Sequence, residues 1–221
     1  MGMPSSTVKF SKLEKMAYLA LKNAVRLHLD SILLFEHGSF PSSLQMSILA
    51  MEELGKACEL EHYWFHARID SRETPEEEQQ WLLLLFNHPW KQQAAVGRDM
   101  LEYSPKFIHF VQNRKLEVTK QRATYVGLRK THRGIDIAGT IQSPFAVKSA
   151  FPRKQISLIN DILLEICRVN LAQNEYFDIE SMNSLINHKL ISHLKLRWKR
   201  RSGIKSTRWL KEWISRIKKR A

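Results

Sequence analysis

The stretch ALKNAVRLHLDSILLFEHGSFPSSLQMSILAMEELGKACEL, residues 20–60, decides the fold class of this 221-residue chain. On both sides of Gly38 its apolar residues recur every three or four positions, which is the spacing of one face of an α-helix. Glycine suits the end of a helix, and Pro41 suits the first turn of the next one. We therefore predict a helical hairpin, with a first helix that ends near Phe35 and a second helix from Pro41 to about Arg68.

Helical periodicity continues along most of the remaining chain, and no segment shows the alternation of a half-buried strand. A capping box at residues 74–77 predicts a third helix, which Pro89 should end or kink. The periodicity weakens over residues 104–152 and returns over residues 156–190. Within the weak part, residues 125–145 hold three glycines and a proline, so we expect a long irregular excursion there. These patterns predict an all-α fold, an antiparallel bundle of about five to seven helices.

Composition places the chain among ordinary globular proteins, with 43% hydrophobic residues. Its longest uninterrupted apolar run, residues 81–86, is far shorter than the roughly 20 residues of a membrane-spanning helix. No signal-peptide pattern follows the first methionine. The two cysteines, Cys58 and Cys167, each lie within an apolar helical pattern, so we expect reduced thiols in the core and a cytoplasmic location.

The net charge of +13 belongs almost entirely to the C-terminal end of the chain. Residues 189–221 hold 13 Lys and Arg and one acid, a net charge of +12, whereas residues 1–188 carry a net charge of +1. We therefore predict a nearly neutral helical domain, residues 1–188, followed by a basic tail, residues 189–221.

The basic tail interleaves cations with tryptophans, and its apolar residues between 209 and 217 have helical spacing, which predicts a basic amphipathic helix. Three interpretations stay open. The tail can bind phosphates and unpaired bases of RNA or another nucleic acid, which we favour over peripheral contact with an anionic membrane. It can also dock on the helical domain or on a second subunit. The nucleic-acid interpretation assigns contacts to Arg197, Trp198, Lys199, Arg200, Arg201, Arg208, Trp209, Lys211 and Trp213.

Three segments of the helical domain resemble the AbiV family of bacterial abortive-infection proteins, a branch of the all-α HEPN superfamily. The first is the hairpin of residues 20–60. The second is NHPWK, residues 87–91, which is similar to a histidine-x-x-lysine segment of that family. The third is KQRATYVGL, residues 120–128, which is similar to its arginine and tyrosine-valine segment. The segments occur in the family's order, and the resemblance covers roughly residues 17–128.

This resemblance implies a HEPN-like bundle that forms a homodimer, with pockets at the two-fold interface. It also implies an anti-phage effector that arrests growth or translation once infection is sensed, with a phage protein as a candidate trigger. RNA cleavage is one mechanism for such an arrest. The alternative is a non-enzymatic binding module that blocks a phage protein, a ribosome or a nucleic acid through the basic tail.

Two departures from the family pattern bear on catalysis. Gly127 follows Tyr125 and Val126 at the position where the pattern has an aspartate. HEPN ribonucleases generally carry an arginine, four to six intervening residues and a histidine, and no arginine of this chain has a histidine at that spacing. Ribonuclease activity is therefore not implied by motif, and whether the protein is an enzyme stays open.

The residues that match the family pattern nevertheless suggest a catalytic set. A base from this set would take the proton of a ribose 2′-hydroxyl, and its cations would stabilise charge on the phosphorane without a metal. The set could equally be a buried polar network or, for its helical acid–lysine pairs, a surface ion pair. Its members are Glu53, Lys56, His88, Lys91, Arg122 and Tyr125.

A metal site is the other chemical interpretation of the second predicted helix. Glu59, His62 and His66 are spaced three and four residues apart, so one helix face could present all three as ligands. A di-metal bundle needs a second Glu-x-x-His helix, and the sequence has none. We therefore expect neither a metal nor another cofactor.

Overall fold

The computed structural model describes residues 7–69, 72–97, 101–128, 130–131, 134–173, 176–202 and 205–206. These ranges contain nine α-helices and only two-residue strands, which confirms the predicted all-α bundle. The helices outnumber the five to seven expected because several are only four to ten residues long. Only the first part of the basic tail, up to Ser206, lies within the described ranges, so the amphipathic helix expected around residues 209–217 lies outside them.

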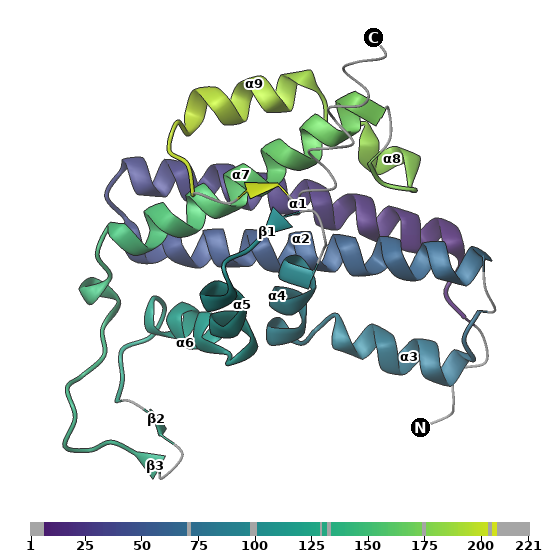
Figure 1. Ribbon diagram of the computed structural model, residues 1–221. Coiled ribbons are helices and arrows are strands. Elements are labelled where there is room, and N and C mark those ends of the chain that lie inside the picture. Colours follow the sequence, from purple (N-terminus) through teal and green to yellow (C-terminus); the bar gives the residue numbers. More distant parts are fainter. Residues whose placement is uncertain are drawn as a thin grey trace.

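The predicted hairpin forms the centre of the molecule as α1 (Phe10–Glu36) and α2 (Phe40–Ile69), which lie antiparallel along most of their length (Figure 1). Gly38 lies between them with φ of +74°, a left-handed conformation that glycine adopts without a steric penalty. Pro41 is the second residue of α2, where no amide donor is needed.

Two short helices follow where the sequence predicted one helix with a break. Thr74 and Glu77 form the predicted capping box at the start of α3 (Pro75–Leu84). The chain leaves α3 before Pro89, which lies in the first turn of α4 (His88–Gly97). Proline is tolerated there because the first amides of a helix have no partner within it. His88 therefore begins a new helix.

The irregular excursion was expected over residues 125–145, and no helix was predicted for the first part of the weakly periodic segment, residues 104–124. That part forms α5 (Pro105–Gln112) and α6 (Lys115–Arg122). Each has eight residues, which is little more than two turns and too short for a clear apolar period.

The arm, residues 123–149, is largely irregular in the part that the structure describes. The described part of the arm contains β2 (Lys130–Thr131), β3 (Gly134–Ile135) and the 3-10 turn η1 (Pro144–Ala146). The arm projects from one end of the bundle (Figure 1).

The long helix α7 (Ala150–Gln173) packs on both helices of the hairpin, and α9 (His188–Arg197) packs on α7 (Figure 1). The short α8 (Glu180–Asn183) contacts α1. On the other side of the hairpin, α4 and α6 pack on α2. Strand β4 (Lys205–Ser206) pairs with β1 (Leu101–Glu102) and so joins the two sides of the bundle.

The core lies between the hairpin and α7, with Leu21, Ile48 and Leu163 fully buried. Cys58 and Cys167 are both buried and not joined in a disulfide, as expected. Within the described ranges, no helix has the length and apolar character needed to cross a bilayer. The predicted boundary between residues 188 and 189 falls within the first turn of α9.

Candidate active site

A buried carboxylate on the inner face of α2 is the centre of the site. Glu52 is only 1% exposed. Its Oε2 lies 2.6 Å from Nδ1 of His88, and its Oε1 accepts hydrogen bonds from Gln92 Nε2 and Lys120 Nζ, both at 2.8 Å. Burial of a charge is costly unless the charge is paired and hydrogen-bonded. Glu52 meets that requirement with partners from two other helices, α4 and α6.

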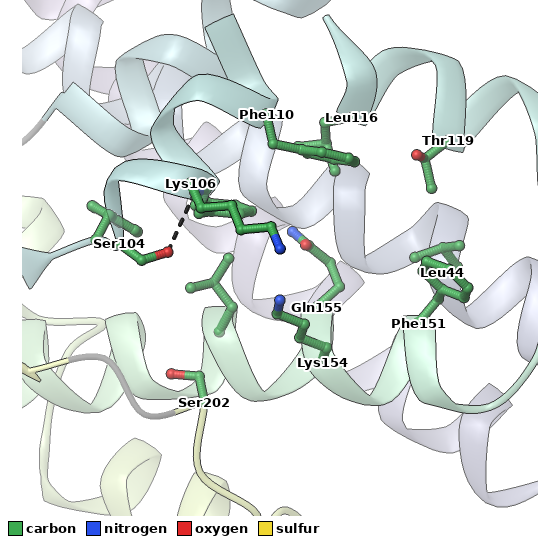
Figure 2. Close-up of a pocket in the computed structure, with 13 residues that line it drawn as sticks. Leu44, Ser104, Lys106, Phe110, Leu116, Thr119, Phe151, Lys154, Gln155 and Ser202 are labelled. Carbon is green, nitrogen blue, oxygen red and sulfur yellow. Dashed lines mark hydrogen bonds between the residues drawn. The ribbon is translucent and has the colours of Figure 1, made fainter. Parts of the chain in front are cut away.

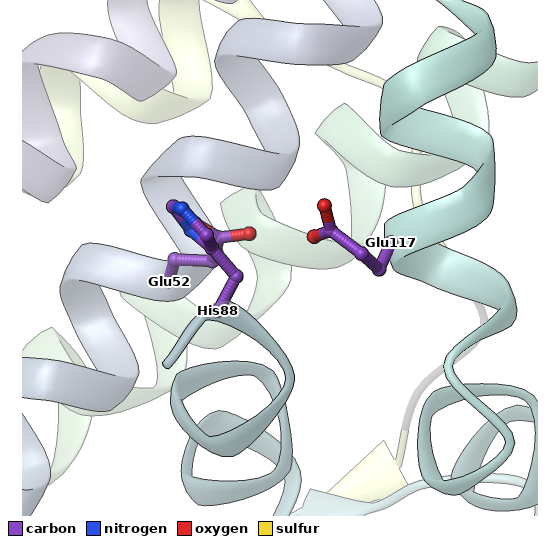
Figure 3. A group of neighbouring side chains, drawn as sticks. All are labelled: Glu52, His88 and Glu117. Carbon is purple, nitrogen blue, oxygen red and sulfur yellow. The ribbon is translucent and has the colours of Figure 1, made fainter. Parts of the chain in front are cut away.

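Helix α6 adds a second carboxylate and the cation that joins the two. Lys120 Nζ also lies 2.8 Å from Oε2 of Glu117, one turn earlier on the same helix. Gln92 Nε2 donates to that same oxygen of Glu117 at 3.3 Å. We call these five residues, Glu52, His88, Gln92, Glu117 and Lys120, the Glu52 cluster. Figure 3 shows its two carboxylates and its imidazole converging from three helices.

His88 is the only member of the cluster with large exposure, since its side chain is 48% exposed. A carboxylate has no proton to donate, so Nδ1 of His88 carries the hydrogen in its 2.6 Å bond to Glu52. In a neutral imidazole, Nε2 then holds the free lone pair. The geometry therefore presents a base with a fixed tautomer at the surface, held by a buried acid, which is the arrangement used for general-base catalysis.

The close approach of α4 to α2 depends on a glycine. A Cβ atom added to Gly55 would lie 2.0 Å from the carbonyl oxygen of Lys91 and 2.9 Å from the amide nitrogen of Ala95. Any larger residue would therefore collide with the backbone of α4 itself. Because Gly55 has no side chain, the backbone of α4 packs closely against α2. His88 and Gln92, which lie one turn apart on the same face of α4, therefore reach Glu52.

The cluster also has the donor types of a cation site. Glu52, His88 and Glu117 each offer a ligand atom, and these atoms lie within 4.8 Å of one another. Lys120 Nζ already lies 2.8 Å from both carboxylates, so a metal ion would have to displace that ammonium group. In the described part of the chain this is the one such group of three, so the Glu59, His62 and His66 set considered from the sequence does not converge.

The predicted catalytic residues do not come together as one pocket. His88 belongs to the Glu52 cluster, and Lys91 is buried one turn further along α4. Glu53 accepts a hydrogen bond from Asn23 Nδ2 at 3.1 Å, and Lys56 is half-buried on α2.

Arg122 and Tyr125 lie elsewhere: Arg122 is the last residue of α6, and Tyr125 follows three residues later. Both are exposed, and both line a hollow of about 660 Å³ whose lining includes none of the other four predicted catalytic residues. If these two residues act on a substrate, they do so away from the base at His88.

Sequence reasoning missed the other four members of the Glu52 cluster. Glu52 lies four residues after Ile48 on the predicted apolar stripe, and an acid in a buried position is a signal that could have favoured it over Glu53. For Gln92, Glu117 and Lys120 the sequence carries helical spacing alone, and helical spacing does not show which faces meet.

The first part of the basic tail is bound to the helical domain. Trp198 is only 3% exposed, its Nε1 donates to Ser157 Oγ at 2.9 Å, and its ring meets Phe35 edge-on at 5.2 Å. The indole face of Trp198 is therefore not open to a stacked base, which corrects its assignment as a nucleic-acid contact.

The cations around Trp198 mostly have partners within the chain. Arg197 pairs with Glu36 at 2.9 Å, Arg201 pairs with Asp161 at 3.1 Å, and Arg200 lies over the Trp198 ring. Lys199 is exposed. The remaining predicted contacts lie outside the described residues: Arg208, Trp209, Lys211 and Trp213.

Comparison with known families gives one match. The family model AbiV, of the HEPN type, matches residues 12–144, which include all five members of the Glu52 cluster and none of the basic tail. No curated protein and no solved structure matches the chain.

Proposed function

Because the chain belongs to the AbiV family of HEPN proteins, we propose that it is an anti-phage effector of the abortive-infection type that arrests growth or translation by cleaving RNA. The family supports the abortive-infection role. One observation supports the chemistry, the 2.6 Å contact between buried Glu52 and half-exposed His88. This pair supplies a base of defined tautomer in a chain that lacks the usual arginine and histidine motif.

In the proposed reaction, His88 Nε2 takes the proton of a ribose 2′-hydroxyl, and the 2′-oxygen attacks the adjacent phosphorus. The bond from phosphorus to the 5′-oxygen breaks, and this oxygen takes a proton from water. The products are a 2′,3′-cyclic phosphate and a 5′-hydroxyl, and His88 returns its proton to solvent. Glu52 acts as a positioning residue, because it holds the tautomer and stabilises the imidazolium.

Positive charge near the base has two sources in this proposal. Lys91 lies three residues after His88 and so on the same side of α4, where its charge favours the phosphorane. Lys120 balances the negative charge of the two carboxylates, Glu52 and Glu117. Since Lys120 fills the place between the carboxylates, the reaction needs no metal, and cleavage should persist in a chelator.

The test compares purified wild-type protein with His88→Ala on end-labelled single-stranded RNA. Loss of a general base should slow cleavage by roughly 10²–10⁴-fold. The matched control is His193→Ala, which removes an exposed histidine on α9, away from the cluster. The same variants are compared by plating efficiency of phage. If His88→Ala cleaves RNA and protects cells like the wild type, the catalytic proposal is wrong.

The alternative function is a binding module that acts through the basic tail. Removal of the whole of residues 189–221 would also remove buried Trp198, so a loss of function could reflect unfolding. Truncation after Ser206 avoids this problem, because it keeps the segment that contacts α7. Loss of protection on this truncation alone, with His88→Ala fully protective, would favour the binding module.

The truncated protein also tests whether the tail binds nucleic acid. Residues 207–221 contain six Lys and Arg and one acid. If they contact phosphates, log affinity for a labelled oligonucleotide should fall linearly with log salt, and the slope should be shallower after truncation. Equal affinity and equal slope in both proteins would remove the nucleic-acid role of these residues.

We also propose that the protein is a homodimer. Several apolar side chains of the arm are exposed to solvent in a single subunit: Ile137 is 82% exposed, Ile141 70% and Phe145 92%. Such side chains are typical of a surface that another protein covers. Light scattering should give twice the mass of the chain, and a strictly monomeric species at high concentration would contradict this proposal.

A further inference from the structure

A second cavity, of about 500 Å³, is lined in part by α6, the helix that also carries Glu117 and Lys120 of the Glu52 cluster. Its walls come from α2, α5, α6 and α7, and Figure 2 shows their side chains facing a common space. Leu116 and Thr119 of α6 face this cavity, whereas Glu117 and Lys120 belong to the cluster. Most of the surface is apolar, from Leu44, Phe107, Phe110, Leu116, Phe151 and Leu158. A volume of this size is typical of small-molecule sites.

Among the residues that the structure describes, two lysines supply the charge on the lining. Lys106 lies on α5 and Lys154 on α7, and both ammonium groups point toward the same part of the cavity (Figure 2). Within the residues that the structure describes, neither has a carboxylate within ion-pair distance. Two uncompensated cations beside an apolar space favour a ligand with a negative group.

Each of the other polar side chains of the described lining makes a hydrogen bond within the protein. Thr119 Oγ1 donates to the Lys115 carbonyl, and Gln155 Nε2 donates to the sulfur of Met51. Ser104 Oγ caps α5. A ligand body with many polar atoms, such as a nucleobase, would lose its hydrogen bonds to water and find few partners in this cavity. That loss costs free energy. An aliphatic body has no such cost.

The two lysines also argue against the chain's own C-terminal residues as the occupant. Residues 207–221 carry a net charge of +5, so the cations of the cavity would repel them. We propose that the cavity binds a single-chain fatty acid, with its carboxylate between Lys106 and Lys154 and its acyl chain along the phenylalanine and leucine side chains. This site goes beyond the proposed function and does not depend on it.

The experiment is a calorimetric titration of the delipidated full-length protein with sodium myristate below its micelle concentration. Wild-type protein should bind one myristate per chain. Lys106→Gln with Lys154→Gln should weaken binding at least tenfold, because both partners of the carboxylate are lost. The matched control, Lys12→Gln with Lys15→Gln, removes the same charge from exposed positions of α1 and should bind like the wild type.

Two further ligands distinguish the chemistry of the site. Tetradecanol has the same chain without the charge and should bind at least tenfold more weakly than myristate to the wild type. Adenosine 5′-monophosphate tests a nucleotide. Equal myristate affinity in the wild type and the Lys106 and Lys154 double variant would overturn the proposal, as would tighter binding of the nucleotide than of myristate. The lysines are exposed, so circular dichroism should show both double variants folded.

Discussion

Substitution of Gly55 by alanine should separate His88 from Glu52. The new Cβ would lie 2.0 Å from the Lys91 carbonyl oxygen, whereas ordinary contact begins at 3.4 Å, so α4 would have to move by about 1.4 Å. If α4 moves as a rigid helix, the 2.6 Å bond between His88 and Glu52 lengthens to about 4 Å, which is beyond hydrogen-bond range. The buried carboxylate would then lose one of its partners.

Two free-energy terms oppose each other in this variant. Alanine is favoured over glycine inside a helix by about 1 kcal/mol. Overpacking at a close helix contact costs about 1 to 3 kcal/mol, and a weakened bond to a buried charge adds to that cost. We therefore expect a net loss of about 1 to 3 kcal/mol in the free energy of unfolding. RNA cleavage should fall nearly as far as in His88→Ala.

Urea unfolding followed by circular dichroism measures the stability, and the RNA cleavage assay measures the site. Gly97→Ala is the matched control, because it lies in the same α4 and a Cβ there would meet nothing within 4 Å. It should leave stability and cleavage unchanged or slightly raise stability. The reasoning fails if Gly55→Ala is as stable and as active as Gly97→Ala.

Three further predictions follow from buried groups. Burial lowers the pKa of His28 to about 4, only partly offset by its hydrogen bond to Asn160, so the folded state resists protonation. The contribution of neutral His28 to the free energy of unfolding should be fully present above about pH 6.5, and the free energy should fall by up to about 3 kcal/mol as pH decreases toward 4. In urea titrations at several pH values, His28→Gln should reduce this pH dependence, and an unchanged pH dependence would exclude His28 as its source. Lys120→Met leaves two facing carboxylates without their cation and should lower the free energy of unfolding by about 3 to 5 kcal/mol; stability equal to that of the wild type would contradict the pairing. Trp198→Ala should cost about 3 to 5 kcal/mol by thermal or urea unfolding, and Trp198→Phe clearly less, because phenylalanine keeps part of the packing; equal stability of both variants and the wild type would mean that this residue is not part of the core.

The hairpin was predictable because its signals are local. An apolar stripe, a glycine at a helix end and a proline in a first turn each act within a few residues, and all three agree for α1 and α2. The capping box of α3 is local in the same way. Helices α5 and α6 were missed because two turns carry too few apolar positions to reveal a period.

The site was only partly predictable because it depends on how helices meet. His88 was predicted through its resemblance to a family segment, but the acid included in the predicted catalytic set was Glu53, whereas the acid that contacts His88 is Glu52. Adjacent helical residues point about 100° apart, and only the docking of α4 shows which one is buried. Trp198 was assigned to nucleic acid because the basic tail interleaves tryptophans with cations, a composition that suits base stacking. Its burial depends instead on contacts with α1 and α7, which lie far away in the sequence.

The Glu52 cluster also affects the order of folding. Glu52 meets His88, Gln92 and Lys120 across 36, 40 and 68 residues of chain, whereas α1 and α2 are joined by a tight turn. Contacts between near segments form faster than contacts between distant ones, so the hairpin can assemble while Glu52 is still hydrated. Substitutions in the cluster should therefore speed unfolding more than they slow refolding in denaturant-jump experiments. During denaturation the site should come apart before the hairpin does, so activity should be lost at a lower urea concentration than helical signal.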